Sequence, residues 1–511
     1  MQPAHPPESD AREADNSLIF WNVAVIFLIF CGFVVVASRT VADPDLWGHL
    51  RFGLDTTQNK GIIQVDPYSY MTTGQRWINH EWLAEVTFAI AWLFYGPTGL
   101  VILKTAIWAI TYAILFWCLA KYPLVPLRAG ILLFLSMTVT LPFIYTVRPQ
   151  SYSALLYTLL LLIIIQAENG RYRWLWACLL IFALWPNLHG AFPAGLGVLA
   201  VWAFVHLLTH RRRGVWLQVI PPLLLSGVAT LINPYGVDLL AFIFSNLDDP
   251  RLEITEWRPL RVHSLMGISY LFWLILAILG IVFSRKQRRP ALLILLAITA
   301  YLPFIASRFG MFFILTALVI AGEHIGDTWD RIMPAPKAPK KRPLWISVTI
   351  IFTALALLIW RLPNFASIPV KDPRAYPQTS VSLLQQSGVS GNLAVHFEWG
   401  DYAIWHLTPS VKVSLDTRRE MAYSDDLYKV NVRYILGIGE WASLLEDYST
   451  DMALVKSASA NDNLMKQRQD WVRIHQDEVS ALYALDGSHQ ADVLLKAAQD
   501  IELVEHNSFF P

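Results

Sequence analysis

Long apolar runs separated by short polar segments fill the chain from residue 18 to residue 363. A helix needs about 20 apolar residues to cross the hydrocarbon core of a bilayer. Runs close to this length predict about eleven membrane-spanning helices. They lie near 18–38, 97–119, 127–146, 149–168, 173–187, 191–209, 216–233, 265–284, 290–306, 309–325 and 343–363. The run at 173–187 is short, so its bounds are loose, and residues 1–17 form a polar tail before the first run.

The segment 82–95 is apolar but short and carries Glu85, so it is either a further span or a helix at the membrane surface. Basic residues separate these alternatives, because cytoplasmic turns are enriched in Lys and Arg. If 82–95 does not cross and the tail 1–17 is cytoplasmic, the inside turns hold Lys121, Arg128, Arg171, Arg173, Arg211–Arg213, Arg285, Lys286, Arg288, Arg289, Lys337 and Lys340–Arg342. The outside turns after the first loop then hold only Arg148, Arg251, Arg258, Arg261 and Arg308. We therefore predict a first outer loop at 39–96, a cytoplasmic N-terminus and a C-terminus outside.

Residues 364–511 have a different pattern, with the composition of a soluble domain. Short β-rich runs alternate there with helical stretches at 377–387 and 461–470. The runs are N-L-A-V-H-F (392–397), V-K-V-S-L-D (411–416), D-M-A-L-V-K (451–456) and S-A-L-Y-A-L (480–485). Such alternation is typical of a small α/β domain. The predicted fold is therefore mainly α, a polytopic transmembrane helical bundle over 18–363 with a C-terminal extracytoplasmic α/β domain over 364–511.

Composition supports this assignment. Hydrophobic residues make up 55% of the chain and charged residues 15%, whereas soluble domains carry about a quarter charged residues. The formal net charge of +1 gives no reason to expect a nucleic-acid partner. Cys31, Cys118 and Cys178 all fall in apolar runs, which argues against a disulfide framework or a cysteine metal site.

Polar clusters gather on the side predicted to face outward. The first is V-A-D-P-D-L-W-G-H-L-R-F-G (41–53), directly after the first span. The others are I-N-H-E-W-L-A-E (78–85), V-R-P-Q (147–150), W-P-N-L-H-G (185–190), I-N-P-Y-G (232–236), L-D-D-P-R-L-E-I-T-E-W-R-P-L (247–260) and S-R-F-G (307–310). Ionisable groups at membrane depth are costly, so their concentration on one face predicts a functional site built from several loops.

Each cluster also has a structural interpretation. Asp43 before Pro44 could be a turn residue that ends the first helix. Asn187 and His189 could satisfy backbone groups at a helix end. Arg148 and Arg308 could be interfacial anchors whose side chains reach the headgroups. The functional hypothesis rests on the joint occurrence of these residues on one face.

The residue types in these loops suit one kind of chemistry. An outward-facing carboxylate can act as a general base on a hydroxyl or amine. Arginines at the same depth can hold a phosphate that becomes the leaving group. No nucleotide reaches the outer side of a bacterial membrane, so an activated donor there is lipid-borne. His49, His80 and Glu81 could bind a divalent metal, although no fixed spacing joins them.

An N-terminal span, an acidic pair opening the first outer loop, a juxtamembrane helix and many further spans resemble the GT-C glycosyltransferase superfamily. That superfamily includes protein O-mannosyltransferases, aminoarabinose transferases and lipopolysaccharide sugar transferases. The motifs are similar to those of an uncharacterised bacterial multi-pass branch placed near it. They are D-P-D-L-W-G-H-L-R-F-G, D-P-Y-S-Y, H-E-W-L, W-P-N-L-H-G, N-P-Y-G and E-W-G-D-Y-A-I-W.

The resemblance implies an inverting transferase of the bacterial cytoplasmic membrane, which moves a sugar from a polyprenyl-phosphate donor to an extracytoplasmic glycan, lipid or protein. It implies Asp43 or Asp45 as the base and Arg148 and Arg308 as the phosphate ligands. Acceptor or metal candidates are His49, His80, Glu81, His189 and Glu256. Two departures keep donor and acceptor open, since Pro44 splits the acidic pair and N-H-E-W-L replaces the K-P-P-L segment of aminoarabinose transferases.

Two other functions fit the same topology. A transporter or flippase for a lipid-linked saccharide needs charged residues in mid-membrane, yet the predicted spans are nearly free of charge. A non-catalytic assembly partner of envelope polysaccharide synthesis would tolerate Asp43→Asn and Asp45→Asn. In the C-terminal domain, W-G-D-Y (399–402) and L-D-T-R-R (415–419) either bind the acceptor or serve packing.

Overall fold

The computed structural model describes residues 8–121, 124–246, 255–334, 343–499 and 508–511. The chain divides into two compact units. The helical unit comprises 1–40, 100–240 and 247–366, and the sheet unit comprises 41–99, 241–246 and 367–511. Arg251, the first half of the 247–260 loop, the basic turn residues from Lys337 to Arg342 and the start of the tail 1–17 lie outside the described residues.

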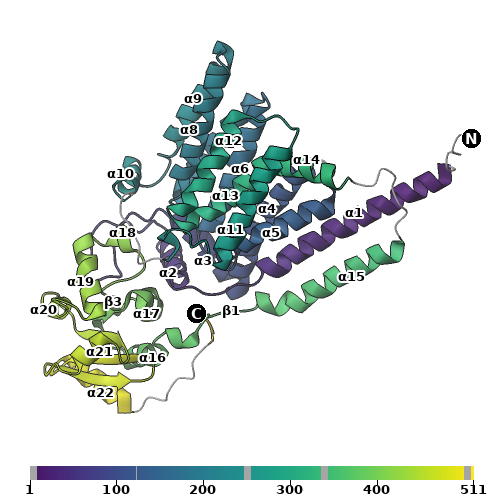
Figure 1. Ribbon diagram of the computed structural model, residues 1–511. Coiled ribbons are helices and arrows are strands. Elements are labelled where there is room, and N and C mark those ends of the chain that lie inside the picture. The colour runs from purple at the N-terminus through teal and green to yellow at the C-terminus, as the bar shows by residue number, and fades with distance from the viewer. Residues whose placement is uncertain (1–7, 122–123, 247–254, 335–342, 500–507) are drawn as a thin grey trace, which may run out of the picture. The chain divides into compact units, whose positions relative to one another are not determined.

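The predicted apolar runs fold as helices of the helical unit (Figure 1). The first part of this unit contains α1 (Glu8–Ala37), α4 (Pro97–Ala120), α5 (Pro126–Ile144), α6 (Gln150–Glu168), η1 (Tyr172–Ala177), α7 (Cys178–Leu188), α8 (Phe192–Thr209), α9 (Arg213–Ala229) and the start of α10 (Val237–Ser245). The second part contains η2 (Thr255–Trp257), α11 (Leu265–Phe283), α12 (Pro290–Tyr301), η3 (Leu302–Phe304), η4 (Ser307–Phe309), α13 (Gly310–Thr316), η5 (Ala317–Ala321), α14 (Gly322–Ile332), α15 (Leu344–Arg361) and η6 (Leu362–Phe365). Proline stands in the first turn of α5, α8 and α12, where its missing N–H leaves no intrahelical bond unmade.

Among the described residues, eight helices are long and apolar enough to cross a membrane. They confirm the polytopic helical fold class. The other three predicted runs are shorter: α9 has 17 residues, α12 has 12 and continues into η3, and the run at 173–187 folds as η1 followed by the 11-residue α7. The helix α1 already begins at Glu8, inside the predicted polar tail, because Glu, Ala and Arg there are good helix formers.

The polar turns of the helical unit meet at one end of the bundle. Asn187 Nδ2 donates to the carbonyl of Ile232 at 2.8 Å, and His189 Nδ1 bonds Ser153 Oγ at 2.8 Å near the start of α6. The amide of Ser307 donates to the carbonyl of Arg258 at 2.8 Å. These contacts join turns that lie far apart in the sequence.

Basic turns meet elsewhere in the same unit. Arg128 at the start of α5 pairs with Asp330 near the end of α14 at 3.3 Å. The amide of Arg285 donates to Asp327 at 2.8 Å, and Lys286 lies 3.9 Å from Glu323. α5 begins among these basic turns and ends beside the polar turns, so the two groups lie at its opposite ends.

The sheet unit contains a five-stranded mixed sheet in the order β3-β2-β4-β6-β5. β2 (Gly391–Val395) pairs in parallel with β3 (Val411–Val413) and β4 (Met452–Lys456), whereas β6 (Ser480–Leu485) pairs antiparallel with β4 and β5 (Trp471–Gln476). A small antiparallel pair joins β1 (Ile368–Pro369) to β7 (Phe509–Phe510). The helical segments are α2 (Asp45–Gln58), α3 (Trp82–Tyr95), η7 (Pro373–Ala375), α16 (Gln378–Ser387), η8 (Phe397–Trp399), α17 (Gly400–Leu407), α18 (Arg419–Ala422), α19 (Asp425–Leu436), α20 (Ser443–Glu446), α21 (Ala460–Met465) and α22 (His489–Gln499).

The four predicted β-rich runs correspond to β2, β3, β4 and β6, and the predicted α/β domain is confirmed. The strand β5 was not predicted. It lies at the sheet edge, with a register shift between Arg473 and His475, so it lacks a clear alternation of buried and exposed positions. The predicted helix over 461–470 ends at Met465, before this strand begins.

The segment predicted as the first outer loop folds into the sheet unit rather than standing apart. The amide of Val413 donates to the carbonyl of Tyr68 at 3.0 Å, and the amide of Tyr70 donates to the carbonyl of Val413 at 3.1 Å. This segment therefore lies along the edge of β3. The segment 82–95 is the helix α3. Its 14 residues span about 21 Å, less than the roughly 30 Å of a hydrocarbon core.

A buried ion pair links this loop to the C-terminal part of the chain. Arg418 is 1% exposed and lies 2.9 Å from Asp66 and 2.6 Å from Asp416. Its guanidinium also lies within 4.6 Å of the ring of Trp77. The two carboxylates balance the positive charge of the buried guanidinium, and the aromatic ring of Trp77 adds a cation–π contact.

Replacing this arginine by methionine leaves two buried carboxylates without their counter-charge. We expect Arg418→Met to lower the free energy of unfolding by about 3–5 kcal/mol. Thermal unfolding of the purified chain, followed by tryptophan fluorescence, measures the effect. Arg374→Met is the matched control, because Arg374 and Glu478 form an exposed pair whose loss costs at most about 1 kcal/mol. An unchanged unfolding temperature for Arg418→Met would contradict this interpretation.

Candidate active site

The acidic pair of the first outer loop stands at the start of α2. Asp45 is the first residue of the helix. The amide of Leu46 donates to the backbone carbonyl of Asp43 at 3.2 Å. Both side chains are half-buried. The pair therefore has the partial exposure that a general base requires.

One turn further on, His49 faces two glutamates. Its Nδ1 lies 3.1 Å from Glu85 and 4.0 Å from Glu81. Asn79 donates to the other oxygen of Glu85 at 2.6 Å. Burial alone would lower the pKa of His49, but the hydrogen bond to Glu85 and the charges of Glu81, Glu85 and Asp45 outweigh it and raise the pKa to about 9. His49 is therefore protonated at neutral pH.

Asp401 of the W-G-D-Y stretch packs directly against this helix. A Cβ added at Gly48 would lie 2.6 Å from Asp401 Cγ, so only glycine allows the approach. Burial raises the pKa of Asp401 well above its usual range, the charge of Asp416 adds to the shift, and the hydrogen bond from Thr417 opposes it. The charges of Asp45 and His49 also influence this carboxyl. W-G-D-Y and L-D-T-R-R thus lie against the segment that the sequence predicts as the first outer loop.

In the helical unit, two arginines from different turns converge on one glutamate. Arg148 Nη1 lies 3.9 Å from Glu256 Oε2, and Arg308 Nη1 lies 3.9 Å from Glu256 Oε1. All three side chains are about one fifth to one third exposed. Arg308 also lies over the ring of Trp257 at 4.4 Å. The arrangement holds two cations side by side at a partly exposed site, which a phosphate could share.

The histidine of the W-P-N-L-H-G turn lies deeper. His189 is 5% exposed and shares Ser153 Oγ with the indole N–H of Trp185, which donates at 2.7 Å. Asn187 donates to the carbonyls of Ala183 and Ile232, as its structural interpretation predicted. These bonds position helices around the arginine site.

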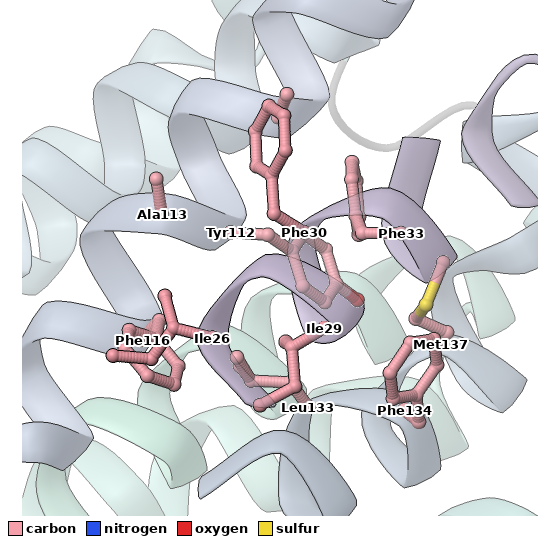
Figure 2. A pocket seen from close by; sticks show the side chains of 11 residues that line it. Ile26, Ile29, Phe30, Phe33, Tyr112, Ala113, Phe116, Leu133, Phe134 and Met137 are labelled. Atoms are coloured by element: carbon pink, nitrogen blue, oxygen red, sulfur yellow. The ribbon is translucent and has the colours of Figure 1, made fainter. Parts of the chain in front are cut away.

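An apolar groove of about 130 Å³ lies among α1, α4 and α5. Figure 2 shows its lining side chains, which include Ile26, Phe30, Phe33, Phe116, Leu133 and Phe134. Met137, which lines the groove, lies about two turns, roughly 10 Å, before the end of α5. Arg148 follows shortly after that end of the helix. The groove therefore lies nearer the middle of these spans than the polar turns do.

Comparison with solved structures shows which fold the chain has. ArnT from Cupriavidus metallidurans in the apo state has a TM-score of 0.57 at 12% identity, covering 92% of this chain and 98% of that one. The Archaeoglobus fulgidus oligosaccharyltransferase in the apo form has a TM-score of 0.56 at 11% identity, with 86% and 70% covered. The mycobacterial arabinofuranosyltransferase AftD has a TM-score of 0.56 at 13% identity, with 92% and 40% covered. No protein-family model and no curated protein matches the sequence.

The chain has the GT-C glycosyltransferase fold. The resemblance found in its motifs is thereby confirmed at the level of fold. ArnT has also been solved bound to undecaprenyl phosphate, a structure that matches this chain with a TM-score of 0.53 at 11% identity, covering 92% of this chain and 98% of that one.

Within this fold the predicted site residues fall into two groups. Asp43, Asp45, His49, His80 and Glu81 belong to the sheet unit, where His80 Nε2 lies 3.9 Å from Glu81. Arg148, His189, Glu256 and Arg308 belong to the helical unit. The candidates for base and metal binding are thus neighbours, as are those for phosphate binding, and their catalytic roles stay predictions.

Sequence reasoning missed several polar residues of this GT-C chain. Glu85 and Asn79 complete the cluster around His49, and only their place in a quoted motif signalled them. Asp401 lies in the W-G-D-Y stretch, but no local signal in the sequence indicates its contact with Gly48. Lys104, within a predicted span, is 2% exposed and donates to Thr40 Oγ1 at 2.7 Å and to the carbonyl of Arg39 at 3.0 Å, next to the end of α1.

The His49 cluster of the GT-C chain fits a divalent cation. One ligand atom from each of His49, Glu81 and Glu85 lies within 4.8 Å of the others, and the set of one imidazole and two carboxylates suits Mn²⁺ or Zn²⁺. A metal would have to displace the proton that His49 holds between the glutamates. The residues could therefore bind either a proton or a metal ion.

We expect the affinity of the purified chain for Mn²⁺ to rise about tenfold for each pH unit between pH 7 and about 9, and then to level off. The reason is that the raised pKa of His49 makes the proton compete with the metal below that value. Calorimetric titration measures the affinity, and His49→Gln should abolish this pH dependence. The same affinity at every pH, or an unaltered profile in His49→Gln, would rule out this site.

Proposed function

We propose that this protein is an inverting glycosyltransferase of the bacterial cytoplasmic membrane. It moves a sugar from a polyprenyl-phosphate donor to an acceptor on the extracytoplasmic side, which is a cell-surface glycan, a lipid or a protein. The observation that carries the proposal is the convergence of Arg148 and Arg308 on Glu256, from two separate turns at one end of a GT-C helical bundle. Two adjacent arginines are suited to a phosphate, and a phosphate would compete with Glu256 for them.

The reaction is a single displacement. Asp43 or Asp45 accepts the proton of the acceptor hydroxyl as its oxygen forms a bond to the anomeric carbon. The bond between that carbon and the phosphate oxygen breaks, and polyprenyl phosphate leaves with the electron pair. Attack from the face opposite the phosphate inverts the anomeric configuration. Arg148 and Arg308 stabilise the charge that develops on the departing phosphate, a role that contributes a few kcal/mol.

The groove among α1, α4 and α5 supports a lipid-borne donor, because its lining is apolar and lies along the spans. A hydrocarbon chain held there would leave its phosphate nearer the ends of the helices. ArnT, which shares the fold, binds undecaprenyl phosphate. A divalent cation held by His49, Glu81 and Glu85 would add positive charge in the sheet unit.

Complementation of a deletion strain tests the proposal. Mass spectrometry of the envelope glycans should show the loss of one glycan on deletion and its return with the wild-type chain. The Asp43→Asn, Asp45→Asn double variant should fail to restore it while reaching the membrane in normal amount. A double variant that restores the glycan would exclude a transferase that uses either aspartate as its base and would favour a non-catalytic assembly partner.

A further inference from the structure

A cavity of about 180 Å³ lies within the sheet unit, and neither the proposed base nor the metal cluster accounts for it. Its walls come from α2, α16, α17, Val370, Tyr376 and the last residues of the chain. Trp47, Tyr376 and Tyr402 form the aromatic part, with His406 beside Tyr402. Ser382 and the exposed Gln385 lie where the cavity opens.

The aromatic walls hold one another in place. The ring of Trp47 lies 4.7 Å from that of Tyr376 and 5.5 Å from that of Tyr402, and the two tyrosine rings are 5.1 Å apart. Such contacts fix the side chains before any ligand arrives. The cavity is therefore preformed, as small-molecule sites usually are.

Two buried polar atoms in the walls lack a partner. Trp47 Nε1 and His406 Nε2 make no hydrogen bond within the part of the chain that the structure describes, and Trp47 is 1% exposed. Burial lowers the pKa of His406 to about 4, so its imidazole is neutral. A buried polar group without a partner costs about 1–3 kcal/mol, and a ligand that reached either atom through a small shift of its ring would recover this.

The character of the walls restricts the ligand. No Asp, Glu, Lys or Arg side chain lines the cavity among the described residues, which favours an uncharged ligand. Aromatic surfaces with scattered hydroxyl, amide, indole and imidazole groups match a ring that is apolar on its faces and carries hydroxyls at its edge. A cavity of roughly 150 Å³ accommodates one six-membered ring.

We infer that this cavity binds one neutral sugar ring, and that this ring belongs to the acceptor. The assignment of the ring to the acceptor rests on the proposed function, whereas the binding of a neutral sugar ring does not. The cavity adjoins the candidate base: Trp47 follows Asp45 by two residues. Burial raises the pKa of Tyr376 in the wall, and the charges of Asp43 and Asp45 raise it further, which places them near that side chain.

Saturation-transfer NMR on the full chain in lipid nanodiscs tests the inference, with methyl glycosides of hexoses, pentoses and N-acetylhexosamines as probes. At least one glycoside should bind. His406→Phe should weaken its binding roughly tenfold, the equivalent of one lost hydrogen bond to a buried group, while the unfolding temperature stays the same or rises. Gln385→Trp should block the opening and abolish binding. Lys429→Trp, at an exposed position of α19 outside the lining, should leave it unchanged.

The outcomes separate this inference from the proposed function. Glycosides that bind the wild-type chain and the Asp43→Asn, Asp45→Asn variant, in a protein that transfers no sugar, would support the cavity and overturn the transferase. Transfer of sugar without any glycoside binding would overturn the cavity alone. Equal binding to His406→Phe, or binding of cyclohexane derivatives without hydroxyls in place of glycosides, would also refute a sugar site.

Discussion

Asparagine in place of the proposed base should lower the rate of sugar transfer by about 10²–10⁴-fold, the usual contribution of a positioned general base. Asp43→Asn and Asp45→Asn should be measured separately, and at least one of them should show this loss. The side chain keeps its size and its hydrogen-bonding capacity, so the fold and the binding of polyprenyl phosphate should persist. Only the acceptance of a proton is removed.

Asp426→Asn is the matched control for these variants. Asp426 lies in α19 of the same unit, and its side chain is 96% exposed, so its transfer rate should equal that of the wild type. Because deprotonation of the acceptor is the step affected, kcat should fall more than KM rises. Near wild-type rates in both Asp43→Asn and Asp45→Asn would show that neither residue is the base.

The second large effect concerns the arginine pair. Arg148→Gln and Arg308→Gln should each lower the transfer rate by about 10²–10³-fold, because each removes a preorganised donor from the oxygen on which charge develops. Unlike the aspartate variants, they should also weaken the binding of polyprenyl phosphate itself. Native mass spectrometry of the purified chain with added undecaprenyl phosphate measures that binding.

Two further variants complete the experiment on the arginines. Arg261→Gln removes the same charge from an exposed position at the same end of the helical unit and should change little. Glu256→Gln removes the carboxylate that the phosphate must displace, so it should bind the lipid phosphate at least as tightly as the wild type. Loss of binding in Arg261→Gln equal to that in Arg148→Gln would indicate a diffuse charge effect instead of a phosphate site.

The helical unit could be predicted largely from its sequence. A backbone in hydrocarbon must satisfy its own hydrogen bonds, so the length of an apolar run predicts a helix with little reference to the rest of the chain. The runs that became η1, α7, α9 and α12 were harder, because internal prolines and short lengths obscure where such a helix ends. Arg148 and Arg308 could be proposed as neighbours because both turns were assigned to one face.

The sheet unit was predictable only in part. Four strands showed a local β-rich pattern, but the placement of 41–99 beside 367–511 depends on contacts between residues more than 300 positions apart. The bonds of Tyr68 and Tyr70 to Val413 are of this kind, as is the packing of Gly48 on Asp401. A single sequence contains no local signal for such contacts. The sequence therefore indicates His49 and Glu81 as metal candidates, but not Glu85, which completes the cluster.

The most direct test of the whole account uses the lipid fraction of a deletion strain, reconstituted in vesicles with the purified wild-type chain and acceptor membranes. We predict that a lipid-linked sugar in this fraction is converted to free polyprenyl phosphate, with one sugar appearing on the acceptor in inverted configuration for each phosphate released. A lipid-linked sugar pool that the wild-type chain leaves unchanged, or a product of retained configuration, would contradict it.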